Sequence, residues 1–308
     1  MSSDRNPGVR VAENDLLGGD DEGVSRAKMS PTLLGSKLDV RALYDPGDGY
    51  VLGFADGTTM SFGDVPVLSS LPRGLHSGDQ EKVIGRSPAV AMARFATGVL
   101  LATAEGAILR VGVERSRLID QGGGDGSCGA VVAIAASDSD GWNGWVLRSD
   151  GSVYNFGTAR WLGDLVGELD DDAAVAICGT PTDDGYAIAT ARGRVFRFGV
   201  DGGEEIVLRR PNLNGSIVAL VWGETRESFW LAASDGGVFS FGQADFYGSL
   251  SGAVGAQGVG SVVGMVKLAS GQGYWVADSH GSVRAFGRAA FLGSALRDRL
   301  EAPCIGIA

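Results

Sequence analysis

The chain contains two imidazoles, His76 and His280. A zinc site needs several imidazole or thiolate ligands placed together, and Cys128, Cys178 and Cys304 form no CxxC pair. His76 lies in the loop sequence LPRGLHSGDQ, and His280 replaces the aspartate of a turn, so we expect both side chains to be solvated. No GxSxG elbow is visible that would mark a serine hydrolase. The sequence therefore predicts no metal site, no cofactor and no catalytic residue, and the protein is expected not to be an enzyme.

Acidic side chains gather in short runs, one of which is Asp170, Asp171 and Asp172. Calcium requires six or more oxygen ligands, and each run is too short to supply them alone. Ordinary turns in which aspartate bonds its own backbone explain such runs. The run 170–172 remains either a solvated loop or part of an interaction surface.

Three tryptophans, Trp145, Trp230 and Trp275, share one register within a repeated segment. Aromatic rings at one register could stack sugar rings at the surface. The alternative is that the indoles pack between neighbouring sheets, where large flat side chains bury much apolar area. Both interpretations stay open at this point.

A hairpin of fifteen residues positions these tryptophans. Apolar strands rich in β-branched and aromatic residues flank a turn glycine, which Asp56, Asp150 or Asp235 precedes in three copies, and Asp-Gly favours a tight type I′ turn. The six copies run over 49–63, 98–112, 143–157, 185–199, 228–242 and 273–287. The turn glycines are Gly57, Gly106, Gly151, Gly193, Gly236 and Gly281. The sequence predicts an all-β fold built from these hairpins.

A second motif, Val-Ala/Gly-Ile/Leu/Met, precedes five of the hairpins and recurs at the end of the chain as Ile305-Gly306-Ile307. Val40-Arg41-Ala42, before the first hairpin, is a looser seventh copy. A small central residue suits a strand near a crowded axis. Short segments after the hairpins, such as Phe246–Ser249 and Phe291–Ser294, are expected to form outer strands. Four strands per unit at a period in the forties predict a seven-bladed β-propeller with four-stranded blades, and a single domain over residues 1–308.

The two ends of the chain are predicted to share one blade. Six hairpins are clear, but the terminal motif at 303–308 has no hairpin after it, and Gly8–Asn14 resembles Gly273–Ser279. We therefore expect residues 1–38 to supply three strands and 303–308 the fourth, so that the ring closes without an open edge. Six further blades would occupy 39–302. The alternative for residues 1–38 is an unstructured acidic arm.

Charge and hydropathy exclude several classes of partner. The net charge of −11 disfavours nucleic acid and anionic lipid. No stretch approaches the ~18 apolar residues of a membrane span, and no basic segment precedes an apolar one as in a secretory signal. We expect no nucleic-acid partner, no membrane insertion and no signal peptide.

The segments Ser228–Ser249 and Gly273–Ser294 resemble a glycine- and aromatic-rich propeller repeat of actinobacteria and their phages. The resemblance implies a propeller whose matching residues serve turns and packing. With no signal peptide, it favours a structural protein of a phage virion, tail-associated or decorating the particle and assembled in the host cytoplasm. Its expected partners are other proteins of the assembly and host cell-surface glycan. The alternatives are a bacterial propeller that binds glycan or protein, in the cytoplasm or at the surface, and an enzyme with a site on the axis.

Overall fold

The computed structural model describes residues 49–68, 87–113, 116–120, 129–137, 140–180, 185–199, 205–207, 213–225, 227–255, 259–295 and 300–308. These residues form antiparallel sheets of three or four strands and no helix, in a β-propeller-like arrangement. None of them forms a helix that could cross a membrane. The predicted all-β class is therefore confirmed.

The described residues contain six sheets, each ordered from its first strand outward. One sheet consists of β20 (Cys304–Ile307), β1 (Gly49–Phe54) and β2 (Thr59–Gly63). The next consists of β3 (Ala89–Phe95), β4 (Gly98–Thr103), β5 (Ile108–Gly112) and β6 (Ser116–Asp120). The next two are β7 (Val131–Ala136), β8 (Gly144–Arg148) and β9 (Val153–Phe156), and β10 (Ala174–Gly179), β11 (Gly185–Thr190), β12 (Arg194–Gly199) and β13 (Glu205–Val207). The last two are β14 (Ile217–Trp222), β15 (Phe229–Ala233) and β16 (Val238–Phe241), and β17 (Val262–Lys267), β18 (Gly273–Asp278) and β19 (Val283–Gly287).

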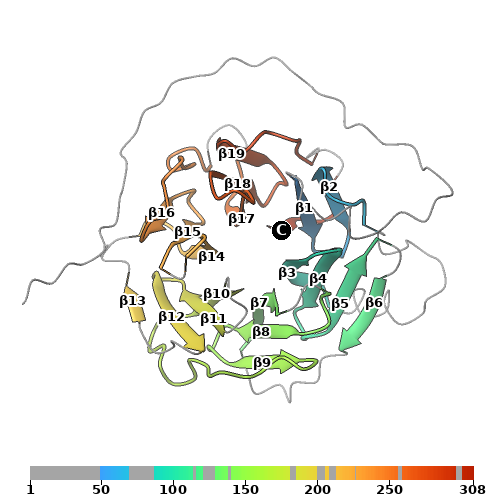
Figure 1. The fold of residues 1–308 in the computed structure, drawn as a ribbon, viewed down its shortest axis with the longest axis vertical. Coiled ribbons are helices and arrows are strands. Elements are labelled where there is room, and N and C mark those ends of the chain that lie inside the picture. The colour runs from blue at the N-terminus through green and yellow to red at the C-terminus, as the bar shows by residue number, and fades with distance from the viewer. Residues whose placement is uncertain are drawn as a thin grey trace, which may run out of the picture.

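The sheets are arranged around a central axis, with the first strand of each sheet innermost (Figure 1). Each first strand contacts the first strand of the next sheet, in the order β3, β7, β10, β14, β17, β20 and back to β3. Six apolar clusters lie between neighbouring sheets, one at each of these boundaries. The core of this protein is therefore a circle of contacts between sheets.

The six predicted hairpins are all confirmed. In each, the turn glycine has positive φ, from 76° at Gly281 to 93° at Gly106. A side chain at this position would be strained, because L-residues rarely adopt this backbone region. At Gly236 a Cβ atom would also lie 2.6 Å from Leu250, so the turn is closed by the following segment.

The first strands contain a feature that the sequence pattern did not reveal. In each sheet the ladder between the first strand and the hairpin shifts register around the first residue of the Val-Ala-Ile motif. This extra residue forms a β-bulge, which bends a strand and increases its twist. The six bulged residues are Val90, Val132, Val175, Val218, Val263 and Ile305.

The strand β20 pairs with β1, in the sheet that β1 and β2 form. The sequence prediction paired residues 303–308 with residues 1–38, which lie outside the described residues. The structure instead places β20 on the first hairpin, and Ala308 and Val51 exchange two backbone hydrogen bonds of 2.8 and 2.9 Å. The shared blade and the count of seven are thus not confirmed. The physical reason is that hairpin 49–63 has an open ladder edge that β20, with the same bulge as the other first strands, satisfies.

The predicted fourth strands are found in two sheets, as β6 and β13. The segments Phe246–Ser249 and Phe291–Ser294 are not strands, which corrects the expectation that every blade has four strands. Gly248 and Gly293 have φ of 135° and 138°, values that ladder residues do not adopt. Their carbonyl groups instead accept hydrogen bonds from tyrosines of the next sheet.

Candidate interaction surface

The three tryptophans predicted as possible interaction residues are buried between sheets. Their side chains are 4%, 2% and 1% exposed at Trp145, Trp230 and Trp275. The indole of Trp275 donates to the carbonyl oxygen of Ala290 at 2.7 Å, and its ring lies 5.3 Å from the ring of Tyr50 in the next sheet. Trp145 and Trp230 repeat this arrangement with Tyr186 and Tyr274.

The tyrosines extend the same contact to a glycine and a phenylalanine. The hydroxyl of Tyr274 donates to the carbonyl oxygen of Gly248 at 2.6 Å, and a Cβ atom at Gly248 would lie 2.6 Å from the ring of Phe286. Tyr50 with Gly293 and Phe62, and Tyr186 with Gly163 and Phe198, form the same set. We call this four-residue contact the Trp–Tyr lock. It occurs at three of the six boundaries, one of which is the boundary that β20 closes.

The lock decides between the two interpretations of the tryptophans. An indole that is at most 4% exposed and packed on a tyrosine cannot stack a sugar at the surface. The packing alternative is therefore what the structure supports. Burial also raises the pKa of Tyr50, Tyr186 and Tyr274 to about 12, although their backbone hydrogen bonds act in the opposite direction.

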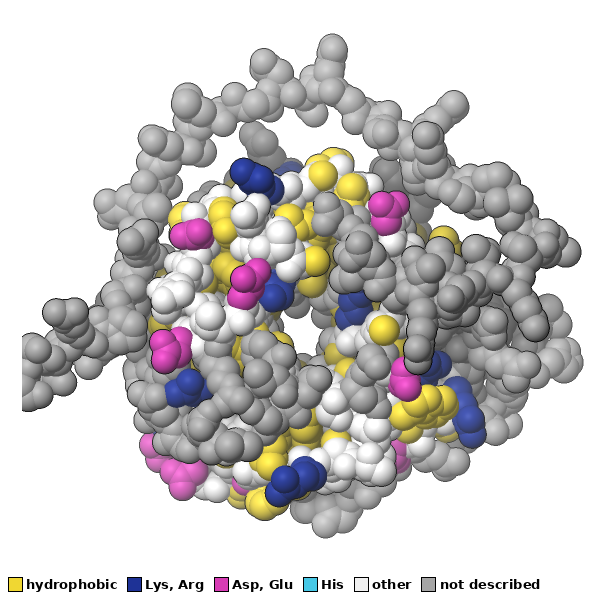
Figure 2. Space-filling model, viewed as in Figure 1, with side chains coloured by type: hydrophobic (Ala, Val, Ile, Leu, Met, Phe, Trp, Pro, Cys, Tyr) yellow, Lys and Arg dark blue, Asp and Glu magenta, His cyan; other side chains and the backbone are white. Residues whose placement is uncertain are grey.

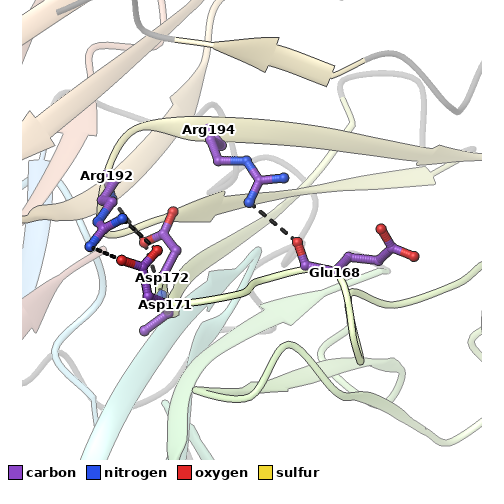
Figure 3. A network of polar contacts seen from close by, with 6 residues as sticks. Glu168, Asp171, Asp172, Arg192 and Arg194 are labelled. Atoms are coloured by element: carbon purple, nitrogen blue, oxygen red, sulfur yellow. Dashed lines mark hydrogen bonds and ion pairs between the residues drawn. The ribbon is translucent and has the colours of Figure 1, made fainter. Parts of the chain in front are cut away.

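The acidic run at 170–172 is a turn held by local bonds (Figure 3). Asp170 has a left-handed φ of 52°, and the carboxylate of Asp171 accepts two hydrogen bonds from Arg192, at 2.6 and 2.7 Å. These bonds lower the pKa of Asp171. The carboxylate of Asp172 accepts from the backbone amides of Ala173 and Arg192. The run therefore ties the chain before β10 to the turn between β11 and β12.

Nearby, Arg194 donates to the backbone carbonyl of Glu168 at 3.3 Å (Figure 3). Both Asp171 and Arg192 are largely exposed, so their ion pair contributes little to stability. No group of three or more metal-ligating side chains lies within the described parts of the chain. The geometry around 170–172 is that of a surface turn held in place by hydrogen bonds.

The remaining candidates are placed as follows. The backbone amide of His280 donates to the carboxylate of buried Asp278, within the turn between β18 and β19. Burial raises the pKa of the Cys178 thiol, and it raises that of Cys304 to about 11. His76 and Cys128 lie outside the described residues.

A partly exposed aromatic and basic group, which the sequence analysis missed, lies between β3–β6 and β7–β9, with Phe95 buried beneath it. We call Phe95, Arg110, Arg117 and Trp142 the Trp142 cluster. The guanidinium of Arg110 lies 4.4 Å from the centre of the Phe95 ring and 4.9 Å from that of Trp142. The guanidinium of Arg117 lies 5.4 Å from the centre of the Trp142 ring. Trp142 is 39% exposed in spite of these two contacts, and Arg117 is exposed.

Hydrogen bonds and tight packing hold this cluster in place. The Nε atom of Arg110 donates to the carbonyl oxygen of Asp140 at 2.8 Å, which joins β5 to the loop before β8. In that loop, Gly141 has a φ of 69°, and a Cβ atom there would lie 2.5 Å from the ring of Phe95. The cluster is thus a positioned surface, since the backbone of one sheet holds the side chain of the other.

The signal that could have found the cluster is the second tryptophan in DGWNGW. Trp145 falls in the repeat register and Trp142 does not, so Trp142 is not explained by the packing of the repeat. The other signal is the pair Arg110 and Arg117. These residues are direct cross-strand partners on β5 and β6, but the repeat alignment did not include β6.

The same end of the ring holds further basic residues near its axis. Arg94 and Lys267 lie in equivalent positions, near the ends of the first strands β3 and β17. They donate to the backbone carbonyl oxygens of Gly49 and Gly223, each at 3.2 Å. The space-filling view shows a narrow central opening with Lys or Arg side chains beside it (Figure 2).

Comparisons with protein families and with curated proteins find no match to this chain. The functional argument therefore depends on the geometry of the surfaces described above.

Proposed function

We propose that the protein is a six-bladed β-propeller that serves as a non-enzymatic interaction module of a phage virion. In this proposal it is tail-associated or decorates the particle, and it contacts other virion proteins and the host surface. The observation that carries the interaction role is the contrast between buried and exposed aromatics. The repeat tryptophans are buried between the sheets, whereas Trp142 and Arg117 of the Trp142 cluster are exposed.

The blade count of six is supported by the contacts between sheets. Apolar clusters lie at six boundaries, and the cluster that contains Tyr50 and Cys304 also contains Trp275. The ladder between β20 and β1 supports closure of the ring by one strand from the end of the chain. A ring closed in this way gives hairpin 49–63 an innermost strand like those of the other five described sheets and suits a rigid scaffold.

The virion assignment is supported by the resemblance of Ser228–Ser249 and Gly273–Ser294 to the repeat of actinobacteria and their phages.

A non-enzymatic role is supported by the protonation state of the Cys178 thiol. Burial raises the pKa of Cys178, so the group stays a protonated thiol at neutral pH and is a weak nucleophile.

The test is to locate the protein in purified particles. Particles from a lysed host culture are banded in a density gradient, and peptides of the chain are quantified by mass spectrometry across the fractions. We expect its peptides to follow the infectious band at a constant ratio to the major capsid protein. Absence from that band would remove the virion role.

The second candidate is a bacterial propeller that binds glycan or protein, and the Trp142 cluster fits this role equally well. Recovery of the protein from uninfected cells, with none in particles, would favour it. The third candidate, an enzyme with an axial site, would be favoured by turnover that is lost in Lys267→Ala or Arg94→Ala.

A further inference from the structure

We propose that the Trp142 cluster binds an acidic polysaccharide, with a pyranose ring against Trp142 and a carboxylate on Arg117. This inference deepens the proposed interaction role and rests on it. It assigns a ligand class to a surface that the repeat itself does not explain.

The first argument is local charge. The chain carries a net charge of −11, yet this surface presents two guanidinium groups on one tryptophan. Among the described residues no carboxylate pairs with Arg117. An anionic ligand would supply a countercharge to Arg117 at this point of an otherwise acidic protein.

The second argument is the placement of the two arginines. Arg110 and Arg117 are directly opposite each other in the antiparallel ladder of β5 and β6. Like charges in this position repel and destabilise a sheet. The contact with the Trp142 ring offsets part of this cost, and a bound carboxylate would offset more. Side chains that are unfavourable for folding yet held in place are typical of binding surfaces.

The third argument is the chemistry of the ligand. A guanidinium binds a carboxylate through two parallel hydrogen bonds, and its planar fork gives this contact directionality. An indole that is partly exposed offers a flat apolar surface for the C–H face of a sugar ring. The combination selects a ligand with a carboxylate beside a flat, weakly polar ring, which describes a uronic acid unit better than a neutral sugar.

The experiment measures binding of the full chain to polygalacturonate, hyaluronate and alginate, with amylose as a neutral polymer and poly-glutamate as an acidic peptide. Biolayer interferometry at low and high salt gives the affinities. We expect at least one acidic polysaccharide to bind, with affinity that falls as salt increases, and amylose to bind at least tenfold more weakly.

Three variants locate the site. Trp142→Ala and Arg117→Glu are each expected to weaken binding at least tenfold. Arg117→Lys, which keeps the charge and loses the planar fork, should weaken it less. The matched control is Trp161→Ala, because Trp161 is 54% exposed and its ring has no guanidinium contact among those found for the described residues. That variant should bind like the wild type.

Several results would overturn the inference. These are failure of all three acidic polysaccharides to bind, equal binding of amylose, or equal loss of binding in Trp161→Ala. Equal or tighter binding of poly-glutamate would assign the cluster to a protein partner instead. Arg117 is exposed, so Arg117→Glu tests the site even if Trp142→Ala loosens the fold. These outcomes leave the virion test unaffected, because that test measures where the protein is found.

Discussion

The boundary that β20 closes and the boundary between β3–β6 and β7–β9 are built differently. At the closing boundary the Trp–Tyr lock joins Trp275, Tyr50 and Gly293, and the amide of Cys304 donates to the carbonyl oxygen of Ser279. At the other boundary, Leu100 occupies the repeat position of the lock tryptophan, and Gly144 occupies that of the lock tyrosine.

The two boundaries also differ in backbone bonds. At five boundaries the carbonyl of a hairpin-turn residue accepts from the first amide of the next first strand, as Ser279 does from Cys304. Within the described residues, the boundary between β3–β6 and β7–β9 is the one where this bond is not found. Side chains join it instead, with Tyr154 donating to the carbonyl of Gly106 and Arg110 to that of Asp140.

This difference shows that aromatic side chains have different roles at different boundaries of the ring. Copies with intact aromatics use them inside the ring, where they hold the blades together. The boundary between β3–β6 and β7–β9 is one of those without the lock; it keeps its apolar contacts and presents polar and aromatic side chains at the surface.

The largest expected effect is on the closing boundary. Deleting residues 303–308 removes β20, exposes the edge of β1 and takes Cys304 and Ile307 out of an apolar cluster. We expect no cooperative melting transition by circular dichroism. Cys304→Ala, which keeps the strand, serves as the control and should melt cooperatively. A truncated protein that melts at the wild-type temperature would show that the ring does not depend on closure.

A smaller loss is expected for single residues of the lock. Trp275→Ala removes a buried indole and leaves the carbonyl of Ala290 without its donor, so it should cost about 3–5 kcal/mol of unfolding free energy. Leu100→Ala at the matching position of the other boundary should cost less, within the range of about 2–5 kcal/mol typical of a buried leucine, because it removes a smaller side chain and no hydrogen bond. Urea denaturation measures both, and an equal or reversed order would contradict the assigned difference between the boundaries.

High pH should weaken the locks selectively. The pKa of Tyr50, Tyr186 and Tyr274 is raised to about 12 by burial, against about 10 in the unfolded chain. Their contribution is therefore fully present below pH 10 and is lost as pH rises from 10 to 12, because the unfolded chain ionises first.

The triple variant of these tyrosines to phenylalanine tests this dependence. At pH 7 it should lose about 1 kcal/mol for each hydroxyl bond removed. Between pH 10 and 12 its stability should then fall less steeply than that of the wild type. Parallel curves of unfolding free energy against pH would show that the buried hydroxyls do not control alkaline unfolding.

The smallest effect is expected outside both boundaries. Arg192→Ala removes an ion pair between two exposed side chains, so we expect no measurable change in melting temperature. Asp172→Ala should lower the melting temperature, because it deprives two backbone amides of their acceptor. An Arg192→Ala variant that is less stable than Asp172→Ala would reverse this ranking.

Much of the fold was predictable, and the site was not. The hairpins followed from turn glycines and alternating apolar residues, and each was found in its predicted place. The Trp142 cluster was missed because its members come from two sheets and from a strand, β6, outside the repeat. Trp145 was predicted as an interaction residue because it falls in the repeat register, but this regular position indicates packing between sheets.

By itself, the sequence determined the hairpins, their turns and the first strands, because these depend on backbone preferences and on partners nearby in the chain. The tertiary structure decided which ladder β20 joins and which aromatics remain exposed. Several hairpins share the same local sequence pattern and each has an edge open to pairing. The sequence alone therefore cannot determine which hairpin pairs with β20, a strand from the other end of the chain. Only the assembled ring shows that hairpin 49–63 takes β20, that the repeat tryptophans are buried and that Trp142 is not.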